Sequence, residues 1–519
     1  MKHATKKERL LSNRDVYPSC RACKLVVGTH RIEVQQVELW LFIVCLALLF
    51  YIVQLVVILL SERMNANKAA AWIFISMILP VAGFAAYWIA ERDFKRHKRL
   101  RSLELSRLQE AKAISDCVSS AGELNKQWRK RAAEGERLMA ALSAISQRAV
   151  TRRNRVEVLT NGESLFASLL ANLKRAEHHI HMDYYTIRND GIGSKVLDVL
   201  TERAGAGVEV RVLYDGVGSW KLGDDFLIRL QASGGRTACF SPPRSAMAAR
   251  QLNYRNHSKI VVIDGRIGYV GGMNIGDEYL GRNPKLGFWR DTQLRLEGDS
   301  VYFLQELFMK HWAYAAGESL PFDQYTAPHS DPNLSEDGEN VLIVASGPDS
   351  RKEPIMETVF AAVNSARSRI YMTTPYFIPD SALMTAFMSA ARAGVDVRLI
   401  IPGIADTQLV LWGTLSYMEP LLAAGVKVYR YGKGFIHAKV LIIDDLLAAV
   451  GTANMDMRSL HNNFEQNAIL FDERTLQRLV HDFQQDLKDS RQVDPDRFAN
   501  RSRLEKAKEA CGHLLSPLL

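Results

Sequence analysis

Two short segments of this chain carry the same residue types at the same spacing. In the first segment one residue separates His257 from Lys259, Asp264 follows after four more residues, and Asn274 closes a glycine-containing turn. The matching residues of the second segment, each 180 positions further along the chain, are His437, Lys439, Asp444 and Asn454. A single HxKxxxxD pattern is expected by chance on the order of 0.03 times in a chain of this length, so two copies in register indicate a duplicated domain.

Each HxK group lies in an apolar run, HSKIVVID or HAKVLIID, that is typical of a buried strand. Residues i and i+2 of a strand point to the same face, so the histidine and lysine of each copy project into one site. Two imidazoles suit in-line displacement at a phosphodiester, because a neutral one attacks phosphorus while a protonated one supplies the leaving alcohol's proton. The lysines and asparagines stabilise charge on the non-bridging oxygens. The two imidazoles are therefore expected in opposite protonation states near neutral pH.

Two other interpretations of these residues are weaker. A single HxK pair on a strand is usually a half-buried surface pair, but matched duplicates argue against that interpretation. A metal site is disfavoured because only two histidines recur, and the ammonium groups beside them would repel a cation. The sequence therefore predicts a site without a metal or another cofactor.

Each copy is followed by a new strand-like run, residues 288–298 in the first half and residues 463–472 in the second. Alignment of their apolar alternation matches Asp291 with Glu465. We predict that each carboxylate accepts a hydrogen bond from the histidine of its own half and fixes its tautomer, as the acid of a catalytic triad does. The alternative is an ordinary carboxylate at the end of a strand.

Further repeated segments extend the duplication, and each is a strand-like run after a helix-like stretch. They are residues 175–187 with 365–378, and residues 206–216 with 393–403. This alternation predicts an α/β fold of two tandem domains, each a mixed, mostly parallel sheet flanked by helices, with the active site at the interface of the two halves. We place the repeats at residues 151–325 and 341–519, joined by a polar, proline-containing linker at 326–340.

Two apolar, uncharged runs of 22 residues lie near the start of the chain. A helix of that length spans about 33 Å, which matches a hydrocarbon core of about 30 Å. We therefore predict transmembrane helices at residues 37–62 and 68–91. The alternatives are a buried core helix, which two uncharged runs argue against, and a signal peptide, which the length and late start of the first run argue against.

The flanking charges predict an orientation. Residues 1–36 carry eight lysines and arginines, and six more basic residues follow soon after the second run, whereas the short connecting loop carries two. Because basic residues stay on the cytoplasmic side, both termini and the catalytic region are expected in the cytoplasm. Residues 1–36 are then a basic cytoplasmic segment, and residues 92–150 read as a charged helical linker.

The bulk composition agrees with this plan. The chain has 519 residues, of which 47% are hydrophobic, and a formal net charge of +9. A large core is therefore expected, and an acidic partner is plausible. Nucleic acid, anionic lipid and phosphorylated metabolites are all acidic partners of this kind. The six cysteines are scattered and form no recognisable disulfide framework.

The duplicated HxKxxxxDxxxxxxGxxN pattern resembles the catalytic motif of the phospholipase D superfamily, over roughly residues 155–515. Segments such as TTPYFIPD and GTANMDMRSLHNNFEQNA resemble the bacterial cardiolipin synthases within that superfamily. The resemblance implies that one histidine, often the first, here His257, becomes a phosphohistidine, while the other is the general acid and then base. It also implies that the motif residues Asp264 and Asp444 are more structural than catalytic.

The same resemblance implies a reaction and a location. One phosphatidylglycerol gives its phosphatidyl group to the enzyme histidine and releases glycerol. The primary hydroxyl of a second phosphatidylglycerol then resolves the intermediate and gives cardiolipin. The partners are then phospholipids of the bacterial inner membrane, and nucleic acid is not expected to bind.

Hydrolysis of phospholipids is the main alternative, because transfer requires that water be kept from the phosphohistidine. Four aromatic residues are candidates for shielding it, although core packing explains them equally well: Tyr184, Tyr185, Tyr376 and Phe377. A membrane-tethered nuclease and an inactive scaffold are less favoured. The sequence leaves open which histidine is the nucleophile, whether phosphatidylethanolamine is a second donor, and the oligomeric state.

Overall fold

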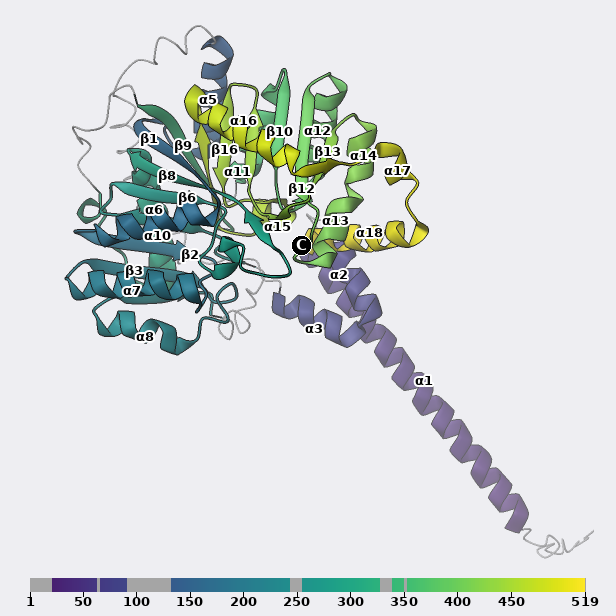
Figure 1. Ribbon diagram of the computed structural model, residues 1–519. Helices are drawn as coiled ribbons and strands as arrows, with labels where there is room; N and C mark the ends of the chain where they lie inside the picture. Colours follow the sequence, from purple (N-terminus) through teal and green to yellow (C-terminus); the bar gives the residue numbers. More distant parts are fainter. Residues whose placement is uncertain are drawn as a thin grey trace, which may run out of the picture. The chain divides into compact units, whose positions relative to one another are not determined.

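The computed structural model describes residues 21–62, 66–90, 132–242, 254–326, 338–349 and 352–518. It divides into two compact units, residues 1–84 and residues 85–519 (Figure 1). Three predicted segments lie partly outside the described residues: the basic segment 1–36, the linker 92–150 and the linker 326–340. In the second of these, the described residues include helix α5 (Ala132–Ser146), and the linker as a whole stays a prediction.

The N-terminal unit contains one long helix, α1 (Arg21–Ser61). Its stretch Gln36–Ser61 has 26 residues and is apolar enough to cross a membrane. At 1.5 Å per residue this stretch is about 39 Å long, which exceeds a hydrocarbon core of about 30 Å. It contains nearly all of the predicted span 37–62, and it is the only such helix in the described part of the chain.

The second predicted span, residues 68–91, is not one continuous helix. It is divided into α2 (Ala66–Ile78) and α3 (Pro80–Ala90), which have 13 and 11 residues. Proline has no backbone N–H and its ring collides with the preceding turn, so the helix breaks at Pro80. Neither piece has the roughly 20 residues that a straight membrane-spanning helix needs.

One sheet of 15 strands runs through both halves of the C-terminal unit (Figure 1). The strands of the first half are β1 (Thr151–Thr160), β2 (His179–Tyr184), β3 (Glu209–Asp215), β4 (Arg236–Phe240), β5 (Lys259–Ile263), β6 (Ile267–Gly271) and β8 (Thr292–Gly298). Those of the second half are β9 (Glu339–Ser346), β10 (Arg369–Thr373), β12 (Asp396–Pro402), β13 (Lys427–Tyr431), β15 (Val440–Ile443), β16 (Leu447–Gly451), β18 (Glu465–Leu470) and β19 (Ser490–Gln492).

The strand order is β19-β13-β12-β10-β15-β16-β18-β9-β1-β8-β6-β5-β2-β3-β4. Apart from β19, this order is symmetric about the antiparallel pair β9–β1, which joins the two halves. The prediction of two separate sheets was therefore wrong. The division into repeats at 151–325 and 341–519 stays a prediction, because both halves belong to one compact unit.

The prediction that the sheets are mostly parallel was also wrong, although they are mixed. Of the fourteen neighbouring pairs, only β2–β3, β3–β4, β10–β12 and β12–β13 are parallel. These are the pairs with helical crossovers that the repeated segments indicated. The HxK strands β5 and β15 instead begin hairpins, because Asp264 and Asp444 turn the chain at φ angles of 53° and 49°.

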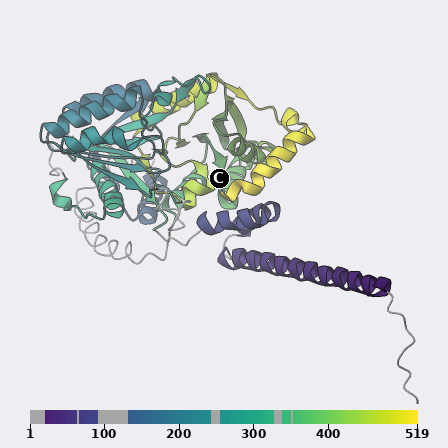
Figure 2. The same ribbon diagram turned by 90° about the horizontal axis from the view of Figure 1, so that it is seen from below.

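Helices cover both faces of the sheet (Figures 1 and 2). The first half contributes α6 (Asn161–Lys174), α7 (Gly191–Gly205), α8 (Asp224–Ala232) and α10 (Ser300–Ala316). The second contributes α11 (Pro354–Ser365), α12 (Ser381–Arg392), α13 (Gln408–Ser416), α14 (Met418–Ala423) and α16 (Glu473–Lys488).

Strand β5 shows how the two faces separate. Ile260 and Val262 pack into one core cluster with residues of α10 and α16, and Val261 and Ile263 into another with residues of α6 and α7. Because every residue of this strand is buried, the HxK strands read as continuous apolar runs rather than as alternating ones.

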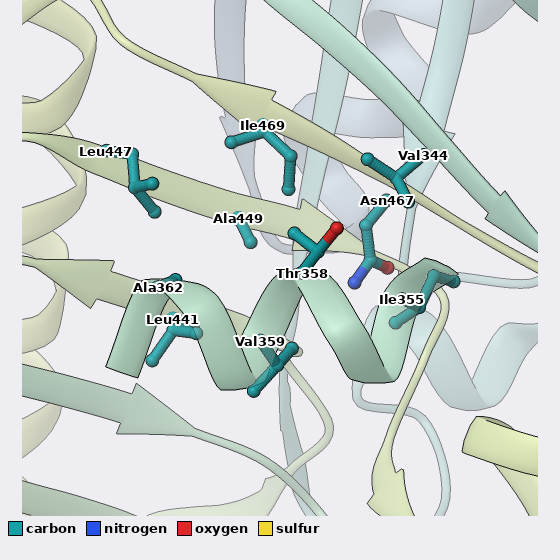
Figure 3. A pocket seen from close by; sticks show the side chains of 10 residues that line it. All are labelled: Val344, Ile355, Thr358, Val359, Ala362, Leu441, Leu447, Ala449, Asn467 and Ile469. Atoms are coloured by element: carbon teal, nitrogen blue, oxygen red, sulfur yellow. The ribbon is translucent and has the colours of Figure 1, made fainter. Parts of the chain in front are cut away.

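Helix α11 packs on strands β15, β16 and β18 and leaves a small cavity. A cavity of about 10 Å³ lies between them, and Figure 3 shows Thr358 of α11 facing the strand that carries Asn467. The Thr358 hydroxyl is buried and has no hydrogen-bond partner among the described residues. An unsatisfied buried hydroxyl costs roughly 1–3 kcal/mol.

We therefore predict that Thr358→Val raises the free energy of unfolding by about 1 kcal/mol, because the methyl group keeps the side chain's shape and removes the unsatisfied hydroxyl. Thermal unfolding of the full-length protein in detergent measures the change. Thr385→Val is the matched control, since that exposed helical hydroxyl donates to the Ser381 carbonyl. A loss of stability in Thr358→Val would show that the hydroxyl has a partner, such as a water in the cavity.

Candidate active site

The two HxK motifs lie at the start of matching hairpins. His257 precedes β5, whose first residue is Lys259, and His437 lies between β14 (Gly434–Ile436) and β15. The hairpin turns place Asp264 and Asp444 at the opposite ends of these strands from the histidines.

Both motif aspartates anchor backbone. The Asp264 carboxylate accepts hydrogen bonds from the N–H groups of residues 177, 178 and 179 at 2.8–3.0 Å. Asp444 accepts from the N–H groups of residues 367, 368 and 369 at 2.7–2.9 Å. These bonds fix the starts of β2 and β10, so the structure separates the two aspartates from the histidines and lysines that the motif groups with them.

The backbone before each histidine is held by the opposite half. Strand β14 pairs in parallel with β7 (Phe288–Arg290), and the His437 N–H donates to the Arg290 carbonyl at 2.7 Å. On the other side the His257 N–H donates to the Phe464 carbonyl at 3.0 Å. Arg290 and Phe464 each immediately precede the predicted histidine-orienting acid.

Each of the two acids consequently contacts the histidine of the opposite half. His257 Nδ1 lies 2.9 and 3.0 Å from the two carboxylate oxygens of Glu465, and His437 Nδ1 lies 2.7 Å from Asp291 Oδ2. The prediction named the right two carboxylates but paired each with the histidine of its own half, which was wrong. Because Nδ1–H donates to the acid, each ring presents its Nε2 lone pair, as a nucleophile or base requires.

Each lysine lies on the same face as its histidine. Lys259 Nζ donates to the His257 carbonyl at 2.8 Å, and Lys439 Nζ donates to the His437 carbonyl at 2.5 Å. The lysines differ in one respect. Lys439 Nζ also lies 3.0 Å from both ring nitrogens of His437, so its positive charge stands close to that ring and opposes protonation of the imidazole.

The two motif asparagines lie in the loops beyond the hairpins and are buried. Asn274 accepts the Thr186 N–H at 3.1 Å and donates to the Tyr279 hydroxyl at 2.8 Å, which leaves one of its amide hydrogens uncommitted. The side-chain oxygen of Asn454 has no hydrogen-bond partner within the part of the chain that the structure describes. Phosphate binding by both residues stays a prediction.

Burial controls the protonation of the site. It lowers the pKa of His257 to about 4 and that of His437 to about 3, and the nearby lysines add to the effect. It also lowers the pKa of Lys259 to about 7 and that of Lys439 to about 8. Both imidazoles are therefore neutral at pH 7 before substrate binds, which differs from the predicted opposite states. A bound phosphodiester anion supplies the counter-charge that restores a proton to one of them.

Aromatic rings surround both histidines. Tyr185 packs edge-on against His257 with ring centroids 4.9 Å apart, and Trp289 lies 5.2 Å from His437. Of the other aromatic residues that the sequence singled out, Tyr184 and Phe377 belong to the hydrophobic core, and the Tyr376 hydroxyl donates to Asp406. The sequence gave no indication of Trp289.

The sequence did not predict a chain of buried hydrogen bonds that lies behind His257. His311 Nδ1 lies 2.7 Å from one Asp183 oxygen, and the other accepts the Asn256 amide at 2.7 Å. Asn256 directly precedes His257, so this chain braces the loop that carries that histidine. The available signal was a buried aspartate in β2 at a position where the matching strand β10 has Thr373.

Comparisons with known proteins identify the family of this chain. A family model described as "Cardiolipin synthase, PLD-like domain" matches residues 169–312 and 359–487. A cardiolipin synthase of Geobacillus kaustophilus is 41% identical over 466 residues, which cover 88% of this chain and 90% of that protein. This chain belongs to the cardiolipin synthase family.

Other relatives extend the comparison. The major cardiolipin synthase ClsA of Bacillus subtilis is 37% identical over 91% of this chain and 98% of its own length. Among solved structures, the phosphatidylserine synthase of Haemophilus influenzae superposes with a TM-score of 0.55 over 74% of this chain and all of that one. At 14% identity that likeness concerns the fold alone.

The crossed acids predict which pairs of substitutions interact. In double-mutant cycles on thermal unfolding of the full-length protein, Asp291→Asn with His437→Ala should show a coupling on the order of 1–3 kcal/mol, because they remove the two ends of one buried hydrogen bond. The pair Glu465→Gln with His257→Ala should behave likewise.

The same-half pairs are the internal control. Asp291→Asn with His257→Ala, and Glu465→Gln with His437→Ala, should be additive to within about 0.5 kcal/mol. Strong coupling in the same-half pairs and none in the crossed pairs would contradict the geometry.

The lysine pKa values predict the pH dependence of kcat/KM on phosphatidylglycerol in mixed micelles. As the pH rises past 7 and then 8, Lys259 and Lys439 lose their protons and the site loses positive charge, so kcat/KM should fall by up to about tenfold per pH unit above pH 8. Because both histidines stay neutral down to about pH 4, no loss is expected between pH 7 and 5.5. A flat profile to pH 9.5 with a loss below 6.5 would contradict these assignments.

Proposed function

We propose that this protein is a phosphatidyl transferase that converts two molecules of phosphatidylglycerol into cardiolipin and glycerol. The observation that carries the proposal is the pair of imidazoles, each with Nδ1 on a buried carboxylate of the opposite half. Such a pair supplies one nucleophile and one acid to a single phosphodiester. The identity of 37–41% to cardiolipin synthases over about nine tenths of the chain supports the choice of lipid substrate.

The reaction has two balanced steps. In the first, the Nε2 of one histidine forms a bond to phosphorus, the bond to the glycerol oxygen breaks, and the other histidine gives that oxygen a proton. In the second, the same histidine takes the proton of the primary hydroxyl of another phosphatidylglycerol, whose oxygen displaces the imidazole from phosphorus. The buried carboxylates stabilise the imidazolium in each step, and the lysines offset charge on the phosphoryl oxygens.

We assign the nucleophile to His257 and the acid to His437. The place of His257 in the first motif copy supports this order, because the first histidine is often the nucleophile in the family that the motif resembles. The chain from His311 through Asp183 to Asn256 supports it too, since a nucleophile must be held in line with the scissile bond.

We propose that the protein crosses the inner membrane twice, with both termini in the cytoplasm. The helix Gln36–Ser61 is long enough for one crossing, and α2 with α3 forms a kinked second crossing. The basic residues before the first run and after the second support this orientation.

Labelling with an impermeant thiol reagent on intact spheroplasts tests the two crossings. A cysteine introduced by Asn67→Cys should be labelled from outside, and the exposed native Cys511 should be labelled only after the membrane is permeabilised. Labelling of both sites from the same side would mean that only α1 crosses.

Purified protein in phosphatidylglycerol liposomes with EDTA tests the activity, with lipid products and glycerol followed by mass spectrometry. Cardiolipin and glycerol should form in equal amounts, and His257→Ala and His437→Ala should each lower the rate by about 10³-fold or more. His481→Ala, an exposed histidine on α16, is the matched control and should keep full activity.

Three results would contradict this proposal in whole or in part. Phosphatidic acid with glycerol in place of cardiolipin would make the protein a phospholipase, because water would then resolve the intermediate. A phosphohistidine at residue 437 rather than 257 in acid-quenched, digested enzyme would reverse the assignment of the two histidines. Folded protein without any lipid turnover would contradict the proposal as a whole.

A further inference from the structure

A second hollow lies in the C-terminal unit, formed by elements other than the two histidine hairpins. It has a volume of about 580 Å³ and is formed by β13, β19 and three helices, α13, α17 (Pro495–Ala499) and α18 (Arg503–Leu515). This volume is within the range of about 300–1,000 Å³ that is usual for small-molecule sites. The family model ends at residue 487, so α17 and α18 add a wall that the matched domains do not include.

One part of the lining is apolar and only partly covered. Leu411, Trp412 and Leu415 come from α13, Val493 follows β19, and Phe498 lies on α17. All five side chains are half-buried. Apolar surface left open in a hollow favours an apolar occupant, because each square ångström removed from water contributes about 25 cal/mol.

The other part of the lining carries a net positive charge, because five basic residues line it against three acids. The three lining acids are committed: Glu509 binds Arg501, Glu505 caps α18 through Ser502, and Asp494 caps α17. Four basic residues remain without an ion pair in the described part of the chain. They are Arg430, Arg491, Arg497 and Lys508.

Two of these cations are placed in a way that suits an anionic ligand. The Arg430 Nε is buried and has no hydrogen-bond partner in the described ranges of the chain, while its Nη2 donates to the Gly403 carbonyl at 3.1 Å. Lys508 Nζ lies 5.6 Å from the centroid of the Trp412 ring, at the border between the apolar and charged parts. A phosphate beside such a border contacts cations while an attached hydrocarbon chain contacts the rings.

Helix α13 connects this hollow to the histidine site. The Thr414 hydroxyl on α13 accepts the Phe377 N–H at 3.2 Å. Phe377 begins β11 (Phe377–Ile378), which pairs with β17 (Met455–Asp456), and β17 directly follows the motif residue Asn454. An occupant of the hollow therefore rests on the same helix that supports the second motif loop.

We propose that this hollow is a second, non-catalytic binding site for one anionic phospholipid. The acyl chain lies on the apolar residues of α13 and α17, and the headgroup phosphate contacts the arginines and Lys508. Free inorganic phosphate shares the headgroup chemistry but uses only the cationic part. The site would hold a lipid beside the catalytic unit independently of the phosphatidyl transfer itself.

Photo-crosslinking tests this site. Full-length protein in detergent micelles is mixed with phosphatidylglycerol that carries a diazirine in one acyl chain, and crosslinked peptides are mapped by mass spectrometry. Crosslinks should map to residues 408–416 and 495–499. Lys508→Gln and Arg497→Gln, both at exposed positions, should each weaken labelling about fivefold, which corresponds to about 1 kcal/mol per cation.

The controls separate the possible sources of binding. Lys506→Gln on the same helix lies outside the lining and should leave labelling unchanged. A zwitterionic phosphatidylcholine probe should label these peptides weakly, and millimolar inorganic phosphate should not displace the phosphatidylglycerol probe. Equal labelling by both lipids, displacement by phosphate alone, or labelling that persists in Lys508→Gln and Arg497→Gln would overturn the proposal. Because labelling needs no turnover, its failure is distinguishable from failure of the transferase reaction.

Discussion

The hydrogen bond from each histidine to a carboxylate of the opposite half is the constraint on which the active site depends. Asp291 and Glu465 are almost fully buried, and a buried carboxylate without a partner costs several kcal/mol. Each acid reaches its histidine because β14 pairs with β7 and the His257 N–H donates to the Phe464 carbonyl. These pairings in turn require the two halves to share one sheet through β1 and β9. Neither half can therefore assemble a complete site alone.

The same burial that fixes the geometry also prepares the site for an anion. Two neutral imidazoles and two lysines with lowered pKa values lie together without a substrate. A phosphodiester brings the negative charge that makes protonation of a histidine and both lysines favourable. Substrate binding and activation of the acid are thus one electrostatic event. A neutral ligand would leave the histidines unprotonated and the site inactive.

Much of the site could be predicted from sequence, because chemistry and duplication leave a local pattern. The HxK pairs and the two acids were identified from spacing and apolar alternation alone. The crossing of the acids could not be, because an internal repeat shows which residues correspond and not which half approaches which. The same reason explains why one shared sheet was not foreseen. The break at Pro80 was visible in the sequence, but its effect on a membrane helix depends on surroundings that the sequence does not specify.

The most direct test of the crossed arrangement is the tautomer and ionisation of each histidine, read from ¹⁵N NMR shifts in full-length protein with ¹⁵N-labelled histidine. In the unsubstituted protein both His257 and His437 should carry hydrogen on Nδ1 and none on Nε2. Asp291→Asn should then change the signals of His437 and leave those of His257 in place, and Glu465→Gln should do the reverse. A change at His257 in Asp291→Asn, with His437 unaffected, would contradict the account.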